Sequence, residues 1–528
     1  MNLRLVCRLL GIIALLIGGA MIFSLPWAYP QLGYRRALEA RPDEFEWGGF
    51  FGLLGSMAVC GVVGLLLLRL GRGSESAKLF RKEAMAVVGL SWTLATVLGA
   101  LPFLFAGTRL GSASDPHEFG PRMTVIDAMF ESQSGFSTTG ATVISNLENT
   151  HVIPHCILFW RSSTHFLGGL GIIVLFVVIL GQGSAGKALM RNEMPGPSKE
   201  GSEARMQHTA WAFAGVYCAL NAVLVLLLMV FGMSSFDALC HSFGTMATGG
   251  FSTYNASLGH FDSPAIKYTV TLFMLLAGSN FTLLYFALVR LQPGRLFRDV
   301  EWRVYASIIG GATLVVLAVG VSGGDFINLG QGLRYGLFQV VSVITTTGFG
   351  THDFDAWNNF GRGVLFLLMF VGGCAGSTGG GIKVIRHILF LKILRLEVEL
   401  SYHPSVIRPL RLGGEPVEDQ ELRRSILVYF CLILTIFIFS WMIVVALEPD
   451  ATWESTGGDV GHKLIDSASG VAATLNNIGP GLGTIGATRN YGHFSQLSKA
   501  LFTVLMMIGR LEIFAVLVLF FPGFWRAR

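Results

Sequence analysis

The sequence predicts an all-α polytopic membrane protein of about ten transmembrane helices. Four pseudo-symmetric repeats are expected to surround a central pore, after two leading N-terminal helices. Three observations carry this prediction. Hydrophobic residues make up 52% of the 528 positions, whereas charged residues make up only 13%. The apolar residues come in blocks of about 20, the length that crosses a bilayer as a helix. Four short glycine-containing segments recur between these blocks.

Spans of two lengths are expected in a fixed order. The full-length candidates are 8–29, 48–70, 84–106, 155–181, 209–232, 267–290, 304–321, 361–395 (interrupted), 424–446 and 498–521. Four apolar stretches near 124–138, 234–248, 332–346 and 462–477 are about half a membrane thick at helical rise. From the third span onward, the order of full span, half-length helix, turn and full span occurs four times. The sequence therefore predicts two leading helices in 1–75 and pore repeats in 76–190, 191–298, 299–400 and 401–528.

Each half-length helix is followed by a similar turn. These four glycine turns are Thr138-Thr139-Gly140-Ala141, Thr248-Gly249-Gly250-Phe251, Thr346-Thr347-Gly348-Phe349 and Asn477-Ile478-Gly479-Pro480. One such turn alone would be interpreted as an ordinary loop. Irregular backbone at membrane depth is tolerated only where it is buried in protein or lines a watery cavity. Four copies in register therefore predict a shared pore, formed by parallel repeats around an axis along the membrane normal.

The residue types in the turns suit a dehydrated monovalent cation. Backbone carbonyl groups must replace the water shell of the ion, and glycine adopts the unusual dihedral angles that this requires. The expected ion-binding residues are Thr138, Thr139, Gly140, Thr248, Gly249, Gly250, Thr346, Thr347, Gly348, Asn477, Ile478 and Gly479. The C-terminal ends of the half-length helices would favour cations further. Asp127, Asp237 and Asp466 each precede a central glycine by 13 residues, and capping of the half-length helix is their expected role.

A second glycine-rich segment interrupts the eighth span. This glycine loop is Gly372-Gly373-Cys374-Ala375-Gly376-Ser377-Thr378-Gly379-Gly380-Gly381. Each glycine in a helix costs about 1 kcal/mol relative to alanine, so an unwound intramembrane loop is expected. Its residues Gly376, Ser377, Thr378, Gly379, Gly380 and Gly381 are the expected gate below the turns. Close helix packing through small residues is the alternative. A phosphate-binding loop is excluded because no Gly-Lys-Ser/Thr sequence follows a strand.

Arg510 is the most unusual charge in the sequence. It lies about 15 Å from either end of the last predicted span, beyond easy snorkelling to the membrane surface. Its side chain must therefore face protein or water, and a structural pair with Glu512 is one arrangement that would satisfy it.

Lysine and arginine gather in alternate connections, at 69–82, 187–205, 290–303 and 383–395, and near both termini. Short cytoplasmic loops collect positive residues, so these loops and both termini are expected in the cytoplasm. The four glycine turns would then open toward the outside.

These motifs resemble those of the Trk/Ktr/HKT superfamily of potassium transporters. Because two additional spans precede the four repeats, the chain is most similar to the membrane subunit of bacterial Trk uptake systems. The resemblance runs from Phe130-Glu131-Ser132 through the turns to the terminal span. It implies a bacterial inner membrane, potassium as the bound and transported ion, and contact with membrane lipid. It also implies a homodimer and a cytosolic nucleotide-binding regulatory subunit. It further implies that Arg510 belongs to the gate, where it would donate hydrogen bonds to the glycine loop and place a positive charge in the ion path. The fourth turn departs most from a potassium signature, which implies weaker selectivity over sodium.

The sequence leaves the mode of transport open. Potassium flow down its electrochemical gradient is the main interpretation, and a potassium symporter coupled to protons or sodium is the alternative. A polytopic membrane enzyme is a further alternative. No HExxH, GxSxG or paired-carboxylate motif favours it, and His151, His155 and His165 have no convincing set of metal-ligand partners. No catalytic residue, organic cofactor or nucleic-acid partner is therefore expected.

Overall fold

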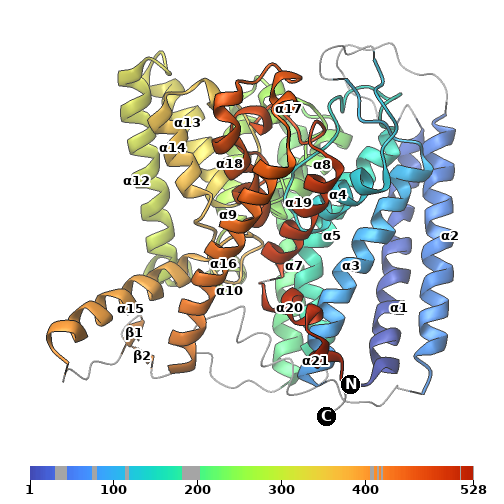
Figure 1. Cartoon of the computed structure of the whole chain (residues 1–528), viewed down its shortest axis with the longest axis horizontal. Coiled ribbons are helices and arrows are strands. Elements are labelled where there is room, and N and C mark those ends of the chain that lie inside the picture. Colours follow the sequence, from blue (N-terminus) through green and yellow to red (C-terminus); the bar gives the residue numbers. More distant parts are fainter. Residues whose placement is uncertain are drawn as a thin grey trace.

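The computed structural model describes residues 1–528 except 30–31, 33–44, 74–79, 113–117, 181–202, 405–409, 413–414, 418–419, 512 and 527–528. Its architecture confirms the predicted all-α membrane fold. Long helices stand side by side, and shorter helices gather between them in the upper half of the molecule (Figure 1). A two-stranded hairpin, which the sequence did not predict, lies beside α15 and is formed by β1 (Leu410–Leu412) and β2 (Glu415–Val417).

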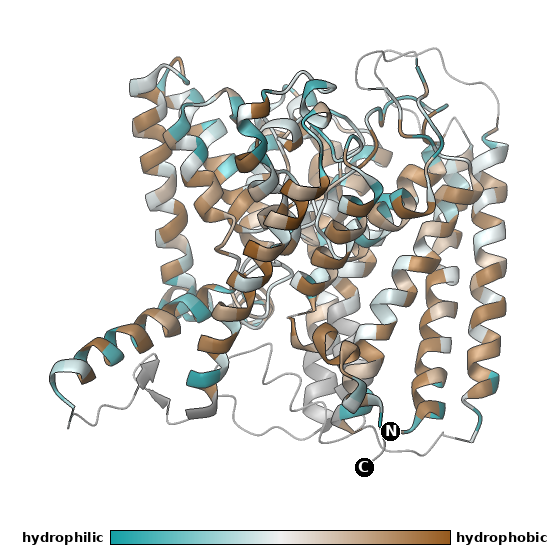
Figure 2. Ribbon diagram, viewed as in Figure 1, coloured by the Kyte–Doolittle hydropathy of each residue, from teal (hydrophilic) through white to brown (hydrophobic). Residues whose placement is uncertain are grey.

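Seven long helices correspond to predicted spans: α1 (Leu3–Ala20) with its extension η1 (Met21–Ala28), α2 (Trp47–Leu70), α3 (Arg81–Phe105), α5 (His155–Leu180), α7 (Glu203–Val230), α12 (Val300–Gly323) and α16 (Gln420–Leu447). Among the described residues, six helices are long and apolar enough to cross a membrane, or up to eight if each of two bent pairs counts as one span. Hydrophobic residues run along α1, α2 and α12, while hydrophilic residues gather in the loops at the helix ends (Figure 2). This distribution is typical of a protein that spans a bilayer.

Two predicted spans are broken, and treating them as continuous was wrong. The span at 267–290 divides into α9 (Pro264–Ala277) and α10 (Phe281–Leu288), which are bent by 113°. The side-chain oxygen of Asn280 accepts hydrogen bonds from the first turn of α10, so a new helix begins there. The last span divides into α19 (Gln496–Arg510) and α20 (Phe514–Leu517) with η6 (Val518–Phe520), bent by 118°. Arg510 therefore ends a helix instead of lying in the middle of one.

The four half-length helices are present as predicted: α4 (Val125–Phe136), α8 (Ser235–Met246), α13 (Leu329–Ile344) and α18 (Lys463–Leu475). Each ends two residues before the start of a glycine turn. In α4 the expected cap is confirmed, because Thr124 and Asp127 form a reciprocal capping box. The predicted interruption of the eighth span is also present, between α14 (Asn359–Leu368) and α15 (Val384–Tyr402).

Short elements complete the described chain: η2 (Ser257–His260), α11 (Gly294–Arg298), η3 (Phe354–Ala356), α17 (Ala451–Glu454), η4 (Val460–His462), η5 (Gly483–Ile485) and α21 (Pro522–Trp525). The start of α1 lies at the same end of the molecule as α21 and α15 (Figure 1). The half-length helices lie toward the opposite end. The first residue of each glycine turn is fully buried, so the turns lie inside the protein.

Candidate ion-binding site

The four glycine turns share one backbone conformation. The first residue of each turn is left-handed, with φ of 52° at Thr138, 55° at Thr248, 58° at Thr346 and 56° at Asn477. The glycine two residues later is also left-handed, with φ of 81° at Gly140, 76° at Gly250, 79° at Gly348 and 99° at Gly479. A residue other than glycine pays about 1–3 kcal/mol for such a conformation. Four different sequences adopt this costly geometry, which indicates a common role.

The four turns form a closed ring. A methyl carbon added to Gly140 would collide with the carbonyl oxygen of Gly249, in the second turn. A methyl carbon added to Gly250 would collide with the carbonyl oxygen of Thr347, in the third turn. A methyl carbon added to Gly348 would collide with the carbonyl oxygen of Ile478, in the fourth turn. The fourth turn closes the circle, because a methyl carbon on Gly479 would lie 2.6 Å from the carbonyl oxygen of Thr139. The equivalent carbonyl oxygens therefore lie where neighbouring turns meet, and no side chain fits there.

Two side chains of the ring keep an oxygen without a partner. Among the described residues, the buried Oγ1 of Thr138 and Oδ1 of Asn477 have no hydrogen-bond partner. The Thr248 hydroxyl donates to the carbonyl of Ala247, and the Thr346 hydroxyl accepts from the N–H of Gly380 at 2.7 Å. Because buried polar atoms are almost always paired in proteins, the oxygens of Thr138 and Asn477 are suited to a cation or to water.

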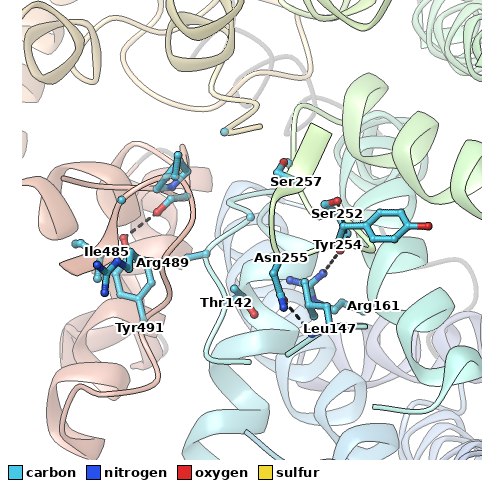
Figure 3. Close-up of a pocket in the computed structure, with 18 residues that line it drawn as sticks. Thr142, Leu147, Arg161, Ser252, Tyr254, Asn255, Ser257, Ile485, Arg489 and Tyr491 are labelled. Atoms are coloured by element: carbon cyan, nitrogen blue, oxygen red, sulfur yellow. Dashed lines mark hydrogen bonds between the residues drawn. The ribbon is translucent and has the colours of Figure 1, made fainter. Parts of the chain in front are cut away.

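A cavity of about 60 Å³ opens on one side of the ring (Figure 3). The four central glycines contribute to its wall together with polar residues that follow the turns, among them Thr142, Ser252 and Asn255. The hydroxyl of Tyr491 donates to the carbonyl of Gly479 at 2.8 Å, which fixes the fourth turn from this side. Arg489 is exposed and also lines the cavity. A cation that enters the ring from this side therefore passes a positive charge.

One acidic side chain supports the loop that lines this cavity. Asp355, in the connection between α13 and α14, accepts a hydrogen bond from the N–H of Gly483 at 2.9 Å. Burial raises the pKa of its carboxyl group to about 6, although the Gly483 N–H and Arg362 oppose the shift. Asp355 thereby connects the third repeat to the loop that follows the fourth turn.

The glycine loop lies on the other side of the ring. It contacts the residues that begin the turns, whereas the cavity is lined by residues that follow them. The N–H of Gly380 donates to Thr346, and Gly379 and Gly381 lie against the third turn and its helix end. The Ser377 hydroxyl donates to the Cys374 carbonyl within the loop. The loop therefore packs against the side of the ring that is opposite the cavity.

The loop also binds the break between α9 and α10. The N–H of Cys374 donates to the carbonyl of Gly278 at 2.9 Å, and the N–H of Phe281 donates to that of Gly376 at 3.0 Å. The hydroxyl of Thr378 donates to the carbonyls of Met246, at 2.9 Å, and Ala277, at 3.1 Å. The unexpected break in the sixth span thus provides the surface on which the loop rests.

Two cationic side chains donate hydrogen bonds to backbone carbonyl groups of the glycine loop. Arg510 is 5% exposed, and its Nη1 donates to the Thr378 carbonyl at 2.7 Å. This is the kind of contact that the resemblance implied. Lys383 donates through Nζ to the carbonyl of Gly379. Glu512, the alternative partner of Arg510, lies outside the described residues.

Residues 82–526 match the family model of TrkH, described as a cation transport protein. The chain belongs to the TrkH family. It is 37% identical to the Trk system potassium uptake protein TrkH of Halomonas elongata and 35% identical to that of Escherichia coli, with 100% of each chain covered. The crystal structure of the potassium transporter TrkH from Vibrio parahaemolyticus matches with a TM-score of 0.81 and 32% sequence identity, again over 100% of both chains.

Several residues of this TrkH-family site were missed by the sequence analysis. The Glu301 carboxylate on α12 accepts the N–H groups of Ala375, at 2.8 Å, and Ile385, at 2.9 Å, so it connects the glycine loop to the first turn of α15. Lys499 on α19 forms a buried ion pair with Asp127, at 2.8 Å. Lys499 lies within the predicted span 498–521, and a charge there is a usable signal, whereas Glu301 precedes the predicted span 304–321 and gave none. Their partners lie far away in the sequence and could not be identified from it.

Proposed function

We propose that this protein takes up potassium through a selectivity filter built by the four glycine turns. The observation that supports this most strongly is the closed order of the ring, in which each central glycine meets a carbonyl of the next turn and the fourth meets the first. The filter ligands are the carbonyl and hydroxyl oxygens of residues 138–140, 248–250 and 346–348, and those of Asn477, Ile478 and Gly479. Potassium is the transported substrate, as it is for the potassium uptake proteins of Halomonas elongata and Escherichia coli that this chain resembles.

Electrostatics favours a cation in this ring. Each half-length helix ends at a turn, so the negative end of its dipole lies beside that turn. Neutral carbonyl and hydroxyl oxygens can replace the water shell of an alkali cation without binding it so tightly that it cannot leave. Anions would meet the same negative potential and be repelled.

The glycine loop is the gate in this proposal, formed by Gly376 to Gly381 and held closed by Arg510. The contacts of Thr378 with Arg510 and of Gly380 with Thr346 support this role, because they connect the loop both to a cation and to the filter. Arg510 would have two roles: it donates a hydrogen bond to the closed loop, and it places a positive charge in the ion path.

Deleting Gly376 to Gly380 is expected to raise potassium flux in proteoliposomes, because the deletion removes the obstruction below the filter. The preference for potassium over sodium should stay at the parental value, since the selective oxygens lie in the turns. A folded deletion protein whose flux is no higher than that of the parent would show that the loop is not a gate. Liposomes without protein give the background leak.

The membrane setting and the assembly follow from the same proposal. The protein resides in the bacterial inner membrane, in contact with lipid, with the end that carries the start of α1 in the cytoplasm. The placement of positive residues in 290–303 and 383–395 supports this orientation. The repeats are 76–190, 191–298, 299–400 and 401–528, after leading helices in 1–75. A homodimer and a cytosolic nucleotide-binding subunit complete the proposed system.

Growth of a bacterial strain without potassium uptake systems tests this function. The strain carrying this protein should grow at potassium concentrations that do not support the empty strain. Failure to grow, with the protein present in the membrane and with a Trk regulatory subunit supplied, would contradict the proposal. The alternative function, symport with protons or sodium, predicts the same rescue but requires the second gradient.

A further inference from the structure

The second turn is supported differently from the first and third. In the first repeat the Ser134 hydroxyl donates to the carbonyl of Ala141, at 2.6 Å. The third repeat has the same contact, because the Ser342 hydroxyl donates to the carbonyl of Phe349 at 2.7 Å. Each serine precedes its partner by seven residues. The corresponding residue in the second repeat is Gly244, which has no hydroxyl group to donate.

His165 contacts the corresponding residue of the second turn, Phe251, but through its N–H group instead of its carbonyl. It lies on α5, in the first repeat, and its side chain is fully buried. Its Nε2 atom accepts the N–H of Phe251 at 3.1 Å, and its Nδ1 atom lies 2.8 Å from the carbonyl of Gly135 in α4. An N–H group needs an acceptor and a carbonyl needs a donor, so the imidazole is neutral, with its proton on Nδ1. One side chain thus links the first half-length helix to the second turn.

The imidazole also limits how far the second turn can move outward. A methyl carbon added to Gly249 would lie 2.6 Å from Cγ and Cδ2 of His165, so the ring packs directly against the turn backbone. Phe251 is held between two side chains of α5. The imidazole of His165 stacks on it with ring centroids 4.1 Å apart, and the guanidinium of Arg161 lies 3.4 Å from its centroid.

Arg161 completes this support. It is buried, its Nε contacts the Glu131 carboxylate at 2.5 Å, and its Nη1 donates to the carbonyl of Ser252 at 3.0 Å. Glu131 in turn accepts from the N–H of Val143, just beyond the first turn. Arg161 and His165 are four residues apart on one helix, so they face the same side of α5. Together they join the first and second turns.

We propose that His165 is a specificity-determining residue that positions the second turn of the filter. Its imidazole replaces the serine brace that the second repeat lacks, and it holds the Gly249–Phe251 backbone at the distance that potassium requires. This inference rests on the proposed function. His165 does not touch the ion but acts through the Phe251 N–H and the Gly249 backbone, so it is a positioning residue.

Three substitutions, assayed for potassium and sodium flux in proteoliposomes, test this role. His165→Leu fills similar space but leaves the Phe251 N–H without an acceptor, and we expect the potassium-to-sodium ratio to fall about fivefold or more. His165→Phe keeps an aromatic surface against Phe251 but also lacks an acceptor, so it should lose selectivity too. His165→Gln offers both an acceptor and a donor, and should retain most of the parental ratio.

The outcomes separate the possible explanations. A parental ratio in a folded His165→Leu protein would overturn the proposal, as would a loss in His165→Gln as large as in His165→Leu. If His165→Leu does not fold, the comparison of His165→Phe with His165→Gln decides the question in the same way. A parent protein with no preference for potassium would instead overturn the proposed function.

Discussion

Replacing Gly348 with serine should abolish potassium transport or reduce the preference for potassium over sodium about tenfold or more. Gly348 has a φ of 79°, and a side chain there would collide with the carbonyl oxygen of Ile478 in the fourth turn. The left-handed conformation alone costs a residue other than glycine about 1–3 kcal/mol. The third and fourth turns must then separate, which moves carbonyl oxygens away from the ion. Flux of both ions in proteoliposomes measures the effect.

Gly363→Ser is the matched control for this substitution. Gly363 lies on α14, and a methyl carbon added there would meet no atom within 4 Å. This variant should transport potassium with the parental selectivity. If Gly348→Ser were expressed normally and behaved like the control, the glycine turns would not be the filter.

Replacing Arg510 with alanine should increase basal potassium flux. The substitution removes a hydrogen bond of 2.7 Å to the carbonyl of Thr378 and also removes a positive charge from the proposed ion path. Both losses act in the same direction, because each destabilises the closed state. A hydrogen bond that involves a charged group is worth about 1.5–3 kcal/mol, so an increase of about tenfold or more is expected. Proteoliposome flux without added regulatory subunit measures it.

The double variant Arg510→Ala with Glu512→Gln separates gating from a structural role. If Arg510 served only as the partner of Glu512, the single change would leave the Glu512 carboxylate unpaired and lower the melting temperature. The second change would then restore stability, and neither protein would show increased flux. That pattern would contradict the gate assignment. Increased flux in both proteins would support it.

The regular parts of the fold were predictable because they recur. The half-length helices, the turns and the interruption of the eighth span all carry signals of composition or spacing that appear in the sequence itself. The break between α9 and α10 could not be predicted, because it depends on the cap at Asn280 and on the contact of that break with the glycine loop. The break after Arg510 was not predicted either, because the apolar residues continue on both sides of it.

The site was predictable to a similar extent. The left-handed conformation of the four central glycines was expected from their residue type and repetition, but that of the first residue of each turn was not. The order in which the turns meet depends on tertiary packing. The pair of Lys499 and Asp127 joins residues 372 positions apart, which no local pattern indicates. His165 was considered only as a metal ligand, because its hydrogen bonds to Gly135 and Phe251 involve backbone atoms that sequence patterns do not describe.

The reversal potential of the purified protein in a lipid bilayer tests the central claim most directly. With potassium and sodium gradients set in opposite directions, and with the pH varied on one side, current through the glycine turns should reverse near the equilibrium potential of potassium. It should not move with the pH gradient. A reversal potential that follows sodium would contradict a potassium-selective filter, and one that shifts with the proton gradient would show coupled transport instead of conduction.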